Sequence, residues 1–212
     1  MTFNSSLIIK IHESLAIDFK LEPGFRDKKL IDSIIQKIDE QISGQEIYPD
    51  LYSKAASLFE GIIRLHPFID GNKRTALASV QEYLFEKEVI FLIPLSAPRF
   101  AVTVAKQIRP DQDYVESLIA SIIMWIKHRC ANFDNIQRLL DLSKSDIILF
   151  EKIREIAKNR NDSKLLTNTI FYMLATEIYP GLDTKPDDIL KFFRDRMERI
   201  QKFYENKSRN FK

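Results

Sequence analysis

Two apolar helical stretches separated by a single proline constrain this fold more than any other feature of the sequence. Residues 51–63 carry apolar side chains at helical spacing, and the same spacing returns over residues 76–84. Pro67 lies between them, and a proline disfavours the α conformation at the residue before it. We therefore expect the first helix to end near Leu65 or His66, which leaves His66 at the corner where the chain exits the helix.

Helical spacing also dominates the rest of the chain. The remaining stretches with this spacing are residues 7–19, 29–42, 100–106, 113–127, 147–159, 165–178 and 189–206. The chain holds only 5 Gly, fewer than β sandwiches and barrels use in their turns. We predict an all-α fold class, with one domain over residues 1–130 and a helical C-terminal extension of unknown role over residues 131–212.

Composition excludes several classes of protein. With 45% hydrophobic and 29% charged residues the chain should fold rather than stay disordered. The densest apolar run, residues 118–126, is far shorter than the ~20 residues that span a bilayer, so we expect no membrane insertion. The single cysteine, Cys130, cannot form an internal disulfide, which favours a reducing compartment and hence a cytoplasmic location.

The charge balance gives no general attraction to nucleic acid. There are 32 basic and 30 acidic side chains, a net charge of +2. The last 22 residues differ, because they carry 8 basic and 3 acidic side chains. We interpret this basic end as a solvated helix face, and an RNA contact there is the less favoured alternative.

The run from His66 to Arg74 gathers polar side chains and a glycine between two apolar helices. Backbone N–H groups around Gly71 to Lys73 are the unpaired donors of a new helix, which makes the turn a pocket for phosphate. The missing side chain at Gly71 lets a ligand approach closely. Lys73 and Arg74 can add charge-assisted hydrogen bonds to phosphate oxygens.

Two further residues of this run suit catalysis. Asp70 offers carboxylate oxygens, the ligand type that Mg²⁺ uses when it also binds phosphates. His66 has an unperturbed pKa near 6.5, which suits removal of a proton from a hydroxyl at neutral pH. His12 and His128 lack a second ligand three or four residues away, so a zinc site is not expected and both are interpreted as structural.

Residues 66–74, His-Pro-Phe-Ile-Asp-Gly-Asn-Lys-Arg, resemble the motif H-P-F-x-[D/E]-G-N-[G/K]-R of the Fic (Fido) family. The variant with Lys73, followed by Thr75 and Ala76, is similar to the death-on-curing (Doc) branch, whose members are toxins of toxin–antitoxin pairs. Segments 11–13, 24–27 and 48–51 are also similar to Doc-like sequences. The resemblance covers roughly residues 7–130.

This resemblance implies a Fic/Doc helical bundle that uses ATP and Mg²⁺ to modify a hydroxyl of a target protein. It assigns each matching position a role: His66 the general base, Phe68 the anchor of the loop, Asp70 the magnesium ligand, Gly71, Asn72 and Lys73 the phosphate nest, and Arg74 the phosphate clamp.

The resemblance leaves the reaction open between two transfers. Most Fic enzymes transfer AMP and carry glycine where this chain has Lys73, and many have a second arginine where it has Leu77. In the Doc branch the γ-phosphoryl group goes to a threonine of elongation factor Tu, and we favour this kinase outcome on a Ser or Thr hydroxyl. AMP transfer is the alternative, which Gly71 favours, and a catalytically idle binding module is a further one.

Self-inhibition by a Fic-type helix is not expected. The pattern [S/T]-x-x-x-E-[G/N] fails at Glu60, where Ala56 takes the Ser/Thr position, and at Glu205, where Gln201 does. We therefore expect a separate antitoxin as a partner, as in Doc-like systems, although Glu205 stays a remote candidate. Association of the chain with further copies of itself is left open.

Overall fold

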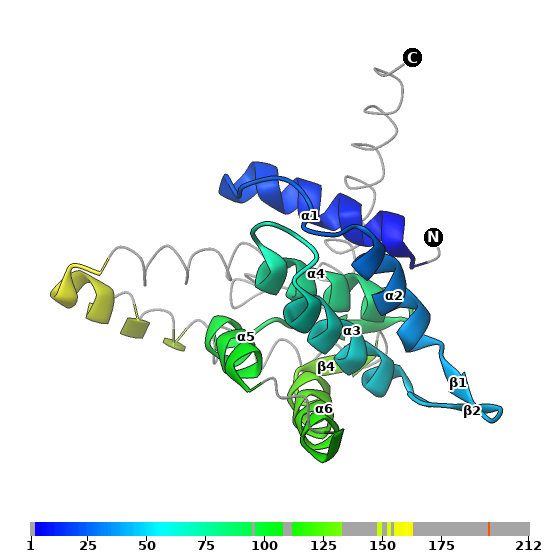
Figure 1. The fold of residues 1–212 in the computed structure, drawn as a ribbon. Helices are drawn as coiled ribbons and strands as arrows, with labels where there is room; N and C mark the ends of the chain where they lie inside the picture. The colour runs from blue at the N-terminus through cyan, green and yellow to red at the C-terminus, as the bar shows by residue number, and fades with distance from the viewer. Residues whose placement is uncertain are drawn as a thin grey trace.

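A computed structural model describes residues 3–94, 96–107, 112–132, 148–149, 152–153, 155–162 and 195. The helices are α1 (Ser5–Phe19), α2 (Lys29–Ile38), α3 (Leu51–Leu65), α4 (Asn72–Phe85), α5 (Ala97–Lys106) and α6 (Gln112–Lys127). Short strands are β1 (Gln41–Ile42), β2 (Gln45–Glu46), β3 (Val89–Phe91) and β4 (Cys130–Asn132). Helices dominate the arrangement (Figure 1), so the predicted all-α fold class is confirmed.

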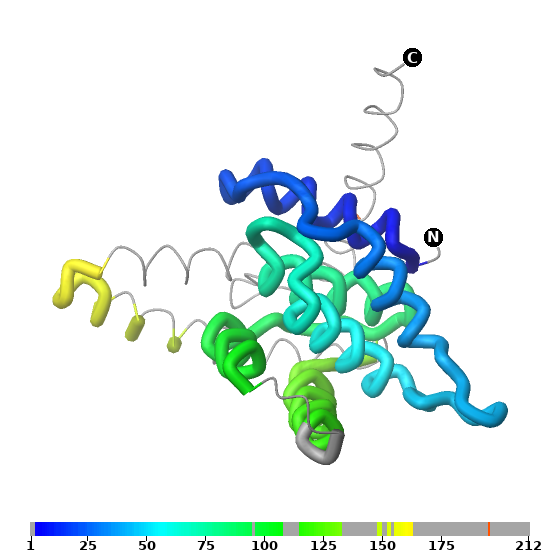
Figure 2. The backbone as a smooth tube through the Cα atoms, viewed as in Figure 1, coloured from blue at the N-terminus to red at the C-terminus, as the bar shows by residue number. Residues whose placement is uncertain are grey.

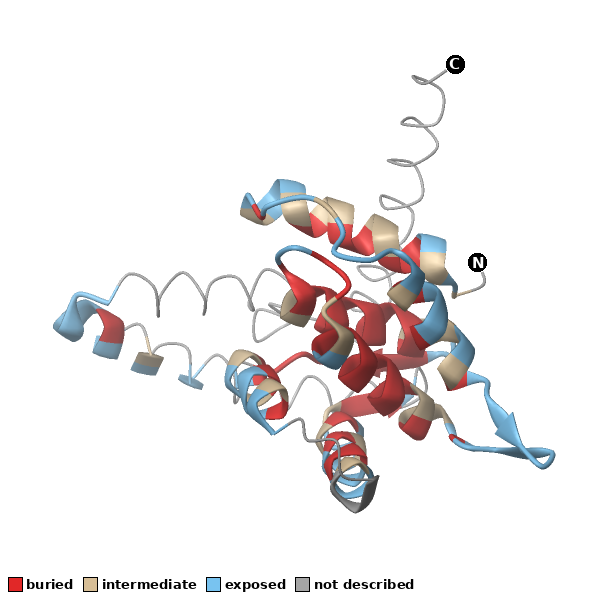
Figure 3. Cartoon of the chain, viewed as in Figure 1, coloured by how far each residue is buried: buried red, intermediate tan, exposed pale blue. Residues whose placement is uncertain are grey.

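The core is built around α3 and α4. Helix α3 packs against α2, α4 and α6, and α4 packs in addition against α1 and β3. Figure 3 shows most of both helices buried. Among the largest side chains with almost no solvent contact are Leu58, Phe59, Ile62, Ile63, Leu77 and Leu84. Burial of apolar surface stabilises this helix pair by about 25 cal/mol per Å². Because the loop between α3 and α4 begins and ends on these two helices, their packing sets the positions of both of its ends.

Capping interactions place both ends of α3. Asp50 begins α3 with a capping box, in which its side chain accepts hydrogen bonds from Tyr52 N–H and Ser53 N–H. His66 follows the last residue of α3 in the left-handed conformation, at φ 49°. The predicted end of this helix, with His66 at the exit corner, is therefore confirmed.

Helix α2 is shorter than predicted. It ends at Ile38, and Ile42, which we expected on its apolar stripe, lies in β1 with 63% of its surface exposed. Ser43 and Gly44 both have positive φ, 53° and 79°, and such a two-residue turn joins antiparallel strands. Strand β1 accordingly pairs with β2, with Gln41 opposite Glu46. The backbone trace shows this hairpin at the end of α3 opposite the α3–α4 loop (Figure 2).

A second pair of strands, β3 and β4, packs against α4 through β3. Strands β3 and β4 pair antiparallel, with Ile90 opposite Ala131, and the Gln81 side chain donates a hydrogen bond from Nε2 to the carbonyl oxygen of Phe91 at 3.0 Å. Neither strand was predicted from the sequence. Because β4 runs from Cys130 to Asn132, this pairing extends just past residue 130, and the division of the chain at that position stays a prediction.

The other predicted helices agree with the described residues. Helix α6 matches the prediction for residues 113–127, and α5 starts three residues before the predicted Phe100, with Pro98 in its first turn, where a missing N–H costs little. Within 147–159, the described residues are helical. The predicted helices 165–178 and 189–206 lie outside the described residues, apart from Asp195. None of the helices in the described ranges has the length and apolar character needed to cross a membrane.

A matched pair of substitutions tests the end of α2. Ile38 is 3% exposed and Ile42 is 63% exposed, although both fall on one stripe by sequence spacing. We expect Ile38→Ala to lower the free energy of unfolding by about 2–5 kcal/mol, because it leaves a cavity in the core. Ile42→Ala should change it by less than about 0.5 kcal/mol, as measured by urea denaturation. Equal losses would mean that α2 continues through Ile42.

Candidate functional site

The loop between α3 and α4 is held by a segment far from it in the sequence. Arg26 N–H donates to the carbonyl oxygen of Pro67 at 2.8 Å, and Ile69 N–H donates to that of Gly24 at 3.1 Å. Phe25 and Phe68 form the antiparallel bridge between these bonds. The segment 24–27, which resembled Doc-like sequences, therefore supports the predicted site directly.

The side chain of Asn72 closes the loop on itself. Its Oδ1 accepts a hydrogen bond from Phe68 N–H at 3.0 Å, and its Nδ2 donates to the carbonyl oxygen of Phe68 at 2.8 Å. Both main-chain groups of Phe68 are thus satisfied by one buried amide, which removes the cost of burying them unpaired. Asn72 is the first residue of α4, so this contact fixes the loop to the helix N-terminus.

His66 lies at the edge of this turn with its ring half-buried. Its Nδ1 is 3.4 Å from Nδ2 of Asn72, a long contact that orients the ring. Burial lowers the pKa of His66 below its ordinary value, and the charges of Lys73 and Arg26 lower the pKa further. The neutral imidazole, which is the form that accepts a proton, is therefore favoured at neutral pH.

The N-terminus of α4 presents main-chain donors beside His66. Within the described part of the chain, the N–H groups of Asn72 and Lys73 make no hydrogen bond, as is typical of the first turn of a helix. Gly71 N–H donates to Oδ1 of the exposed Asp70 at 2.6 Å, so a carboxylate already occupies one of the donors of this turn. Together with the positive end of the helix dipole, these groups suit an anion.

Gly71 is required here for two reasons. It precedes α4 at φ 77°, a conformation that other residues rarely adopt. A Cβ at this position would also lie 2.6 Å from Cδ1 of Leu21 and 3.5 Å from Cε1 of His12. We predicted that the missing side chain leaves room for a ligand, whereas the structure shows that Leu21 and His12 take this space.

The two basic residues of the predicted site lie on the first turn of α4. Lys73 is half-buried and close enough to His66 to lower the pKa of that ring. The Arg74 guanidinium lies 5.8 Å from the ring centroid of Phe19, the last residue of α1, which suits a cation–π contact. The structure thus brings all six predicted site residues together in one turn: His66, Asp70, Gly71, Asn72, Lys73 and Arg74.

One functional-site candidate, His12, was not predicted from the sequence. Only 2% of its surface is exposed, its ring stacks on Phe68 at a centroid separation of 3.8 Å, and its Nδ1 lies 3.1 Å from Oγ1 of Thr75. Its position on the otherwise apolar face of α1, which carries Ile8, Ile11 and Leu15, was the available signal.

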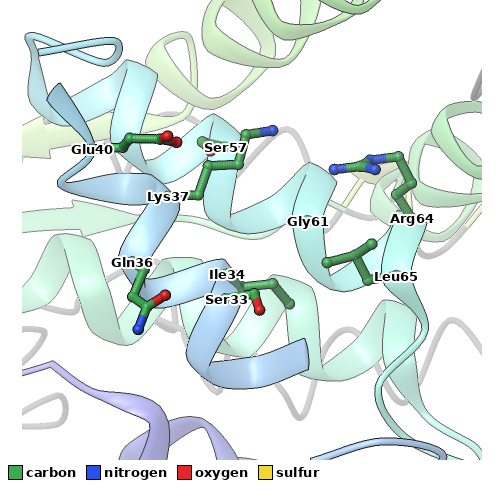
Figure 4. Close-up of a pocket in the computed structure, with 9 residues that line it drawn as sticks. All are labelled: Ser33, Ile34, Gln36, Lys37, Glu40, Ser57, Gly61, Arg64 and Leu65. Atoms are coloured by element: carbon green, nitrogen blue, oxygen red, sulfur yellow. The ribbon is translucent and has the colours of Figure 1, made fainter. Parts of the chain in front are cut away.

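A separate cavity of about 480 Å³ lies between α2 and α3 (Figure 4). Lys37 and Arg64 reach toward each other across it, and the buried Glu60 forms ion pairs with both. The residues that line it are Ser33, Ile34, Gln36, Lys37, Glu40, Ser57, Gly61, Arg64 and Leu65. Because none of these residues belongs to the α3–α4 loop, this cavity is distinct from the candidate site.

The donor set of the site fits a magnesium ion held jointly with a nucleotide. Asp70 supplies one exposed carboxylate at the edge of the turn. The described residues contain no group of three or more histidine, cysteine, aspartate or glutamate side chains that could enclose a metal by themselves. Mg²⁺ commonly takes one or two carboxylates together with phosphate oxygens, and the same turn offers donors for the phosphates.

Comparisons with known proteins match the segment that carries this loop. Residues 2–84 match the family model of the Fic/DOC family. Over 69 residues the chain is 38% identical to a protein named Toxin Doc from Mycolicibacterium smegmatis, a stretch that covers 32% of this chain and 53% of that protein. The chain therefore spans about half the length of this curated relative. The segment that carries the candidate site is therefore similar to the Fic/DOC family and, within it, to a Doc toxin.

Proposed function

We propose that this protein is a toxin of the Doc type that transfers the γ-phosphoryl group of ATP to a Ser or Thr hydroxyl of a target protein. The observation that carries the proposal is the position of His66 at the end of α3, where burial lowers its pKa. Beside it lie the N–H groups of Asn72 and Lys73, which make no hydrogen bond in the described part of the chain. A proton acceptor and an anion site within one turn are what transfer from a phosphate chain to an alcohol requires.

The proposed step is a displacement at the γ-phosphorus of ATP. The target hydroxyl oxygen forms a bond to the γ-phosphorus, and the bond from that phosphorus to the β,γ-bridging oxygen breaks. ADP leaves with the electron pair of the broken bond, and His66 takes the hydroxyl proton. As in other phosphoryl transfers, most of the acceleration should come from positioning and charge neutralisation.

The residues of the turn divide the work of binding. The N–H groups of Asn72 and Lys73 would hold phosphate oxygens, and the side chains of Lys73 and Arg74 would neutralise their charge. Asp70 would hold Mg²⁺, which supplies charge neutralisation on the phosphates when it is bound. Release of the Gly71 N–H by Asp70 on metal binding would add a third main-chain donor.

Two positions favour phosphoryl transfer over AMP transfer. Lys73 brings bulk and charge to a place where AMP-transferring relatives have glycine, so the phosphate chain would have to lie differently across the turn. Leu77 stands where many AMP-transferring relatives have a second arginine. Its side chain is 2% exposed, packs in the core and has no donor or charge that could bind a phosphate. AMP transfer is the second candidate because the chain keeps Gly71 of the AMP-transferring pattern, although Leu21 takes the space beside it.

The relative named Toxin Doc supports a toxin–antitoxin system with a separate antitoxin partner. A Fic-type inhibitory pattern around the buried Glu60 is ruled out by Ala56, which has no hydroxyl. Elongation factor Tu is the first target to test, because it is the target that the Doc branch implies.

The mass of the modified target protein distinguishes phosphoryl transfer from AMP transfer. The full chain is incubated with Mg²⁺, elongation factor Tu and ATP labelled at either the α or the γ position. We expect label from the γ position alone, and a target mass increased by one phosphoryl group. His66→Ala should lower the rate by about 10²–10⁴-fold because the base is lost, whereas His128→Ala, an exposed histidine outside the loop, should not.

Label from the α position would instead assign AMP transfer. Absence of label from both positions, with elongation factor Tu and with a cell extract, would favour the binding module and contradict the proposal.

A substitution at Lys73 tests what selects transfer of the γ-phosphoryl group over transfer of AMP. Lys73→Gly removes the side chain that separates this turn from those of AMP-transferring relatives. We expect the variant to lose phosphoryl transfer and gain AMP transfer, measured as the ratio of the two target masses. Retention of pure kinase activity would mean that Lys73 does not select the reaction.

The protonation state of His66 is tested by NMR. Its folded-state pKa should lie below the ordinary value of 6.5, so the neutral base, and with it the transfer rate, should reach half its maximum below that pH. Arg26→Gln should raise the pKa of His66 because it removes a nearby positive charge. Arg99→Gln, an exposed arginine on α5, serves as the control and should leave it unchanged. A wild-type pKa above 6.5 would contradict the assigned environment.

A further inference from the structure

His12 joins the two sides of the catalytic turn. One face of its ring stacks on Phe68, with the ring planes 17° apart, and its Nδ1 lies 3.1 Å from the hydroxyl of Thr75. Phe68 precedes the main-chain donors of Asn72 and Lys73, and Thr75 follows them. A single side chain of α1 therefore contacts the chain before and after the anion site.

The ring also supports the turn from its inner side. The Cβ direction of Gly71 points to Leu21 and to the ring of His12, whose Cε1 and Nδ1 would lie 3.5 and 3.6 Å from such an atom. The stacked Phe68 is held by the Asn72 side chain through both of its main-chain groups. Movement of the ring would therefore displace Phe68, and through Asn72 the start of α4.

Packing alone does not account for a histidine at this place. In the described part of the chain, Nε2 of His12 is buried without a hydrogen-bond partner, which is an unfavourable state for a polar atom. A phenylalanine would fill the same space on this apolar face of α1 without that cost. The feature that only histidine supplies is the bond to Thr75 combined with the stack on Phe68.

We propose that His12 is a positioning residue for the transfer reaction, which sets the N–H groups of Asn72 and Lys73 through its contacts with Phe68 and Thr75. The proposal rests on the proposed function of the same site. It does not give His12 contact with ATP or with the target hydroxyl. Reacting groups misplaced by about 1 Å can lose about 10²-fold in rate, so a small shift of this turn is enough to matter.

The variants separate the two contacts of the ring. His12→Phe keeps a stacked ring and removes the bond to Thr75, whereas Thr75→Val removes the hydroxyl and keeps His12. The control is Ile11→Val, which removes one methylene group from a buried neighbour of His12 on α1. Ile11 packs in a separate apolar cluster with Leu7 and Leu15, so this variant measures the effect of a small loss of packing. All are made in the full chain and compared by thermal melting.

Two readouts are measured on each variant. In the first, kcat and KM for ATP are determined with the target protein. We expect His12→Phe and Thr75→Val each to lower kcat by about 10- to 100-fold, and the double variant to lose no more than either one, because both remove the same bond. Ile11→Val should keep kcat within about twofold. An unchanged kcat in His12→Phe would overturn the proposal, and so would a decrease in kcat that is fully explained by the fraction of unfolded protein.

The second readout does not depend on turnover. Amide NMR shifts and hydrogen exchange of Asn72 and Lys73 are compared with and without ATP and Mg²⁺. We expect His12→Phe and Thr75→Val to move these signals and to speed exchange there, while Ile11→Val does not. Unchanged signals would overturn the positioning role even if wild type transferred nothing. Failure of wild type to modify any protein, with these signals shifted as expected, would count against the proposed function alone. If His12→Phe did not fold, Thr75→Val would carry both tests.

Discussion

The double hydrogen bond between the Asn72 side chain and the main chain of Phe68 is the interaction on which the site depends. It satisfies both buried polar groups of a loop residue and ties them to the first residue of α4. Without it, two unpaired main-chain groups would be buried, at a cost of about 1–3 kcal/mol each. Its presence allows a six-residue connection to hold a histidine, a carboxylate and a helix N-terminus within one turn.

The elements around this turn contribute different constraints. The core pair α3 and α4 sets the two ends of the loop, and the segment 24–27 adds main-chain hydrogen bonds from outside it. Helix α1 supports the inner side through His12 and contacts Arg74 through Phe19. In the described part of the chain the N–H groups of Asn72 and Lys73 make no hydrogen bond, an arrangement that suits an anionic ligand.

The sequence predicted the helices of this region well because their signals are local. Apolar spacing identified α3 and α4, Pro67 indicated the end of α3, and the motif from His66 to Arg74 predicted the candidate site. The prediction was wrong at Ile42, because a turn of two residues with positive φ ended the apolar stripe. Strands β3 and β4 were missed because their pairing joins residues about 40 positions apart, and no local pattern reports it.

The role of His12 shows the limit of local reasoning within the site. A lone histidine on an apolar helix face was interpreted as structural, since its partners Phe68 and Thr75 lie more than 50 residues away in the sequence. Gly71 is a similar case, because the neighbour that excludes a side chain there is Leu21. The motif names the residues that we propose to meet the ligand, whereas the fold shows what holds them in place.

A crystal structure of the full chain with a non-hydrolysable ATP analogue and Mg²⁺ would test the central claim most directly. The account predicts terminal phosphate oxygens about 2.7–3.2 Å from the main-chain nitrogens of Asn72 and Lys73, with Asp70 on the metal and the γ-phosphorus facing His66. A nucleotide bound at another surface, or bound here with its α-phosphorus facing His66, would contradict it.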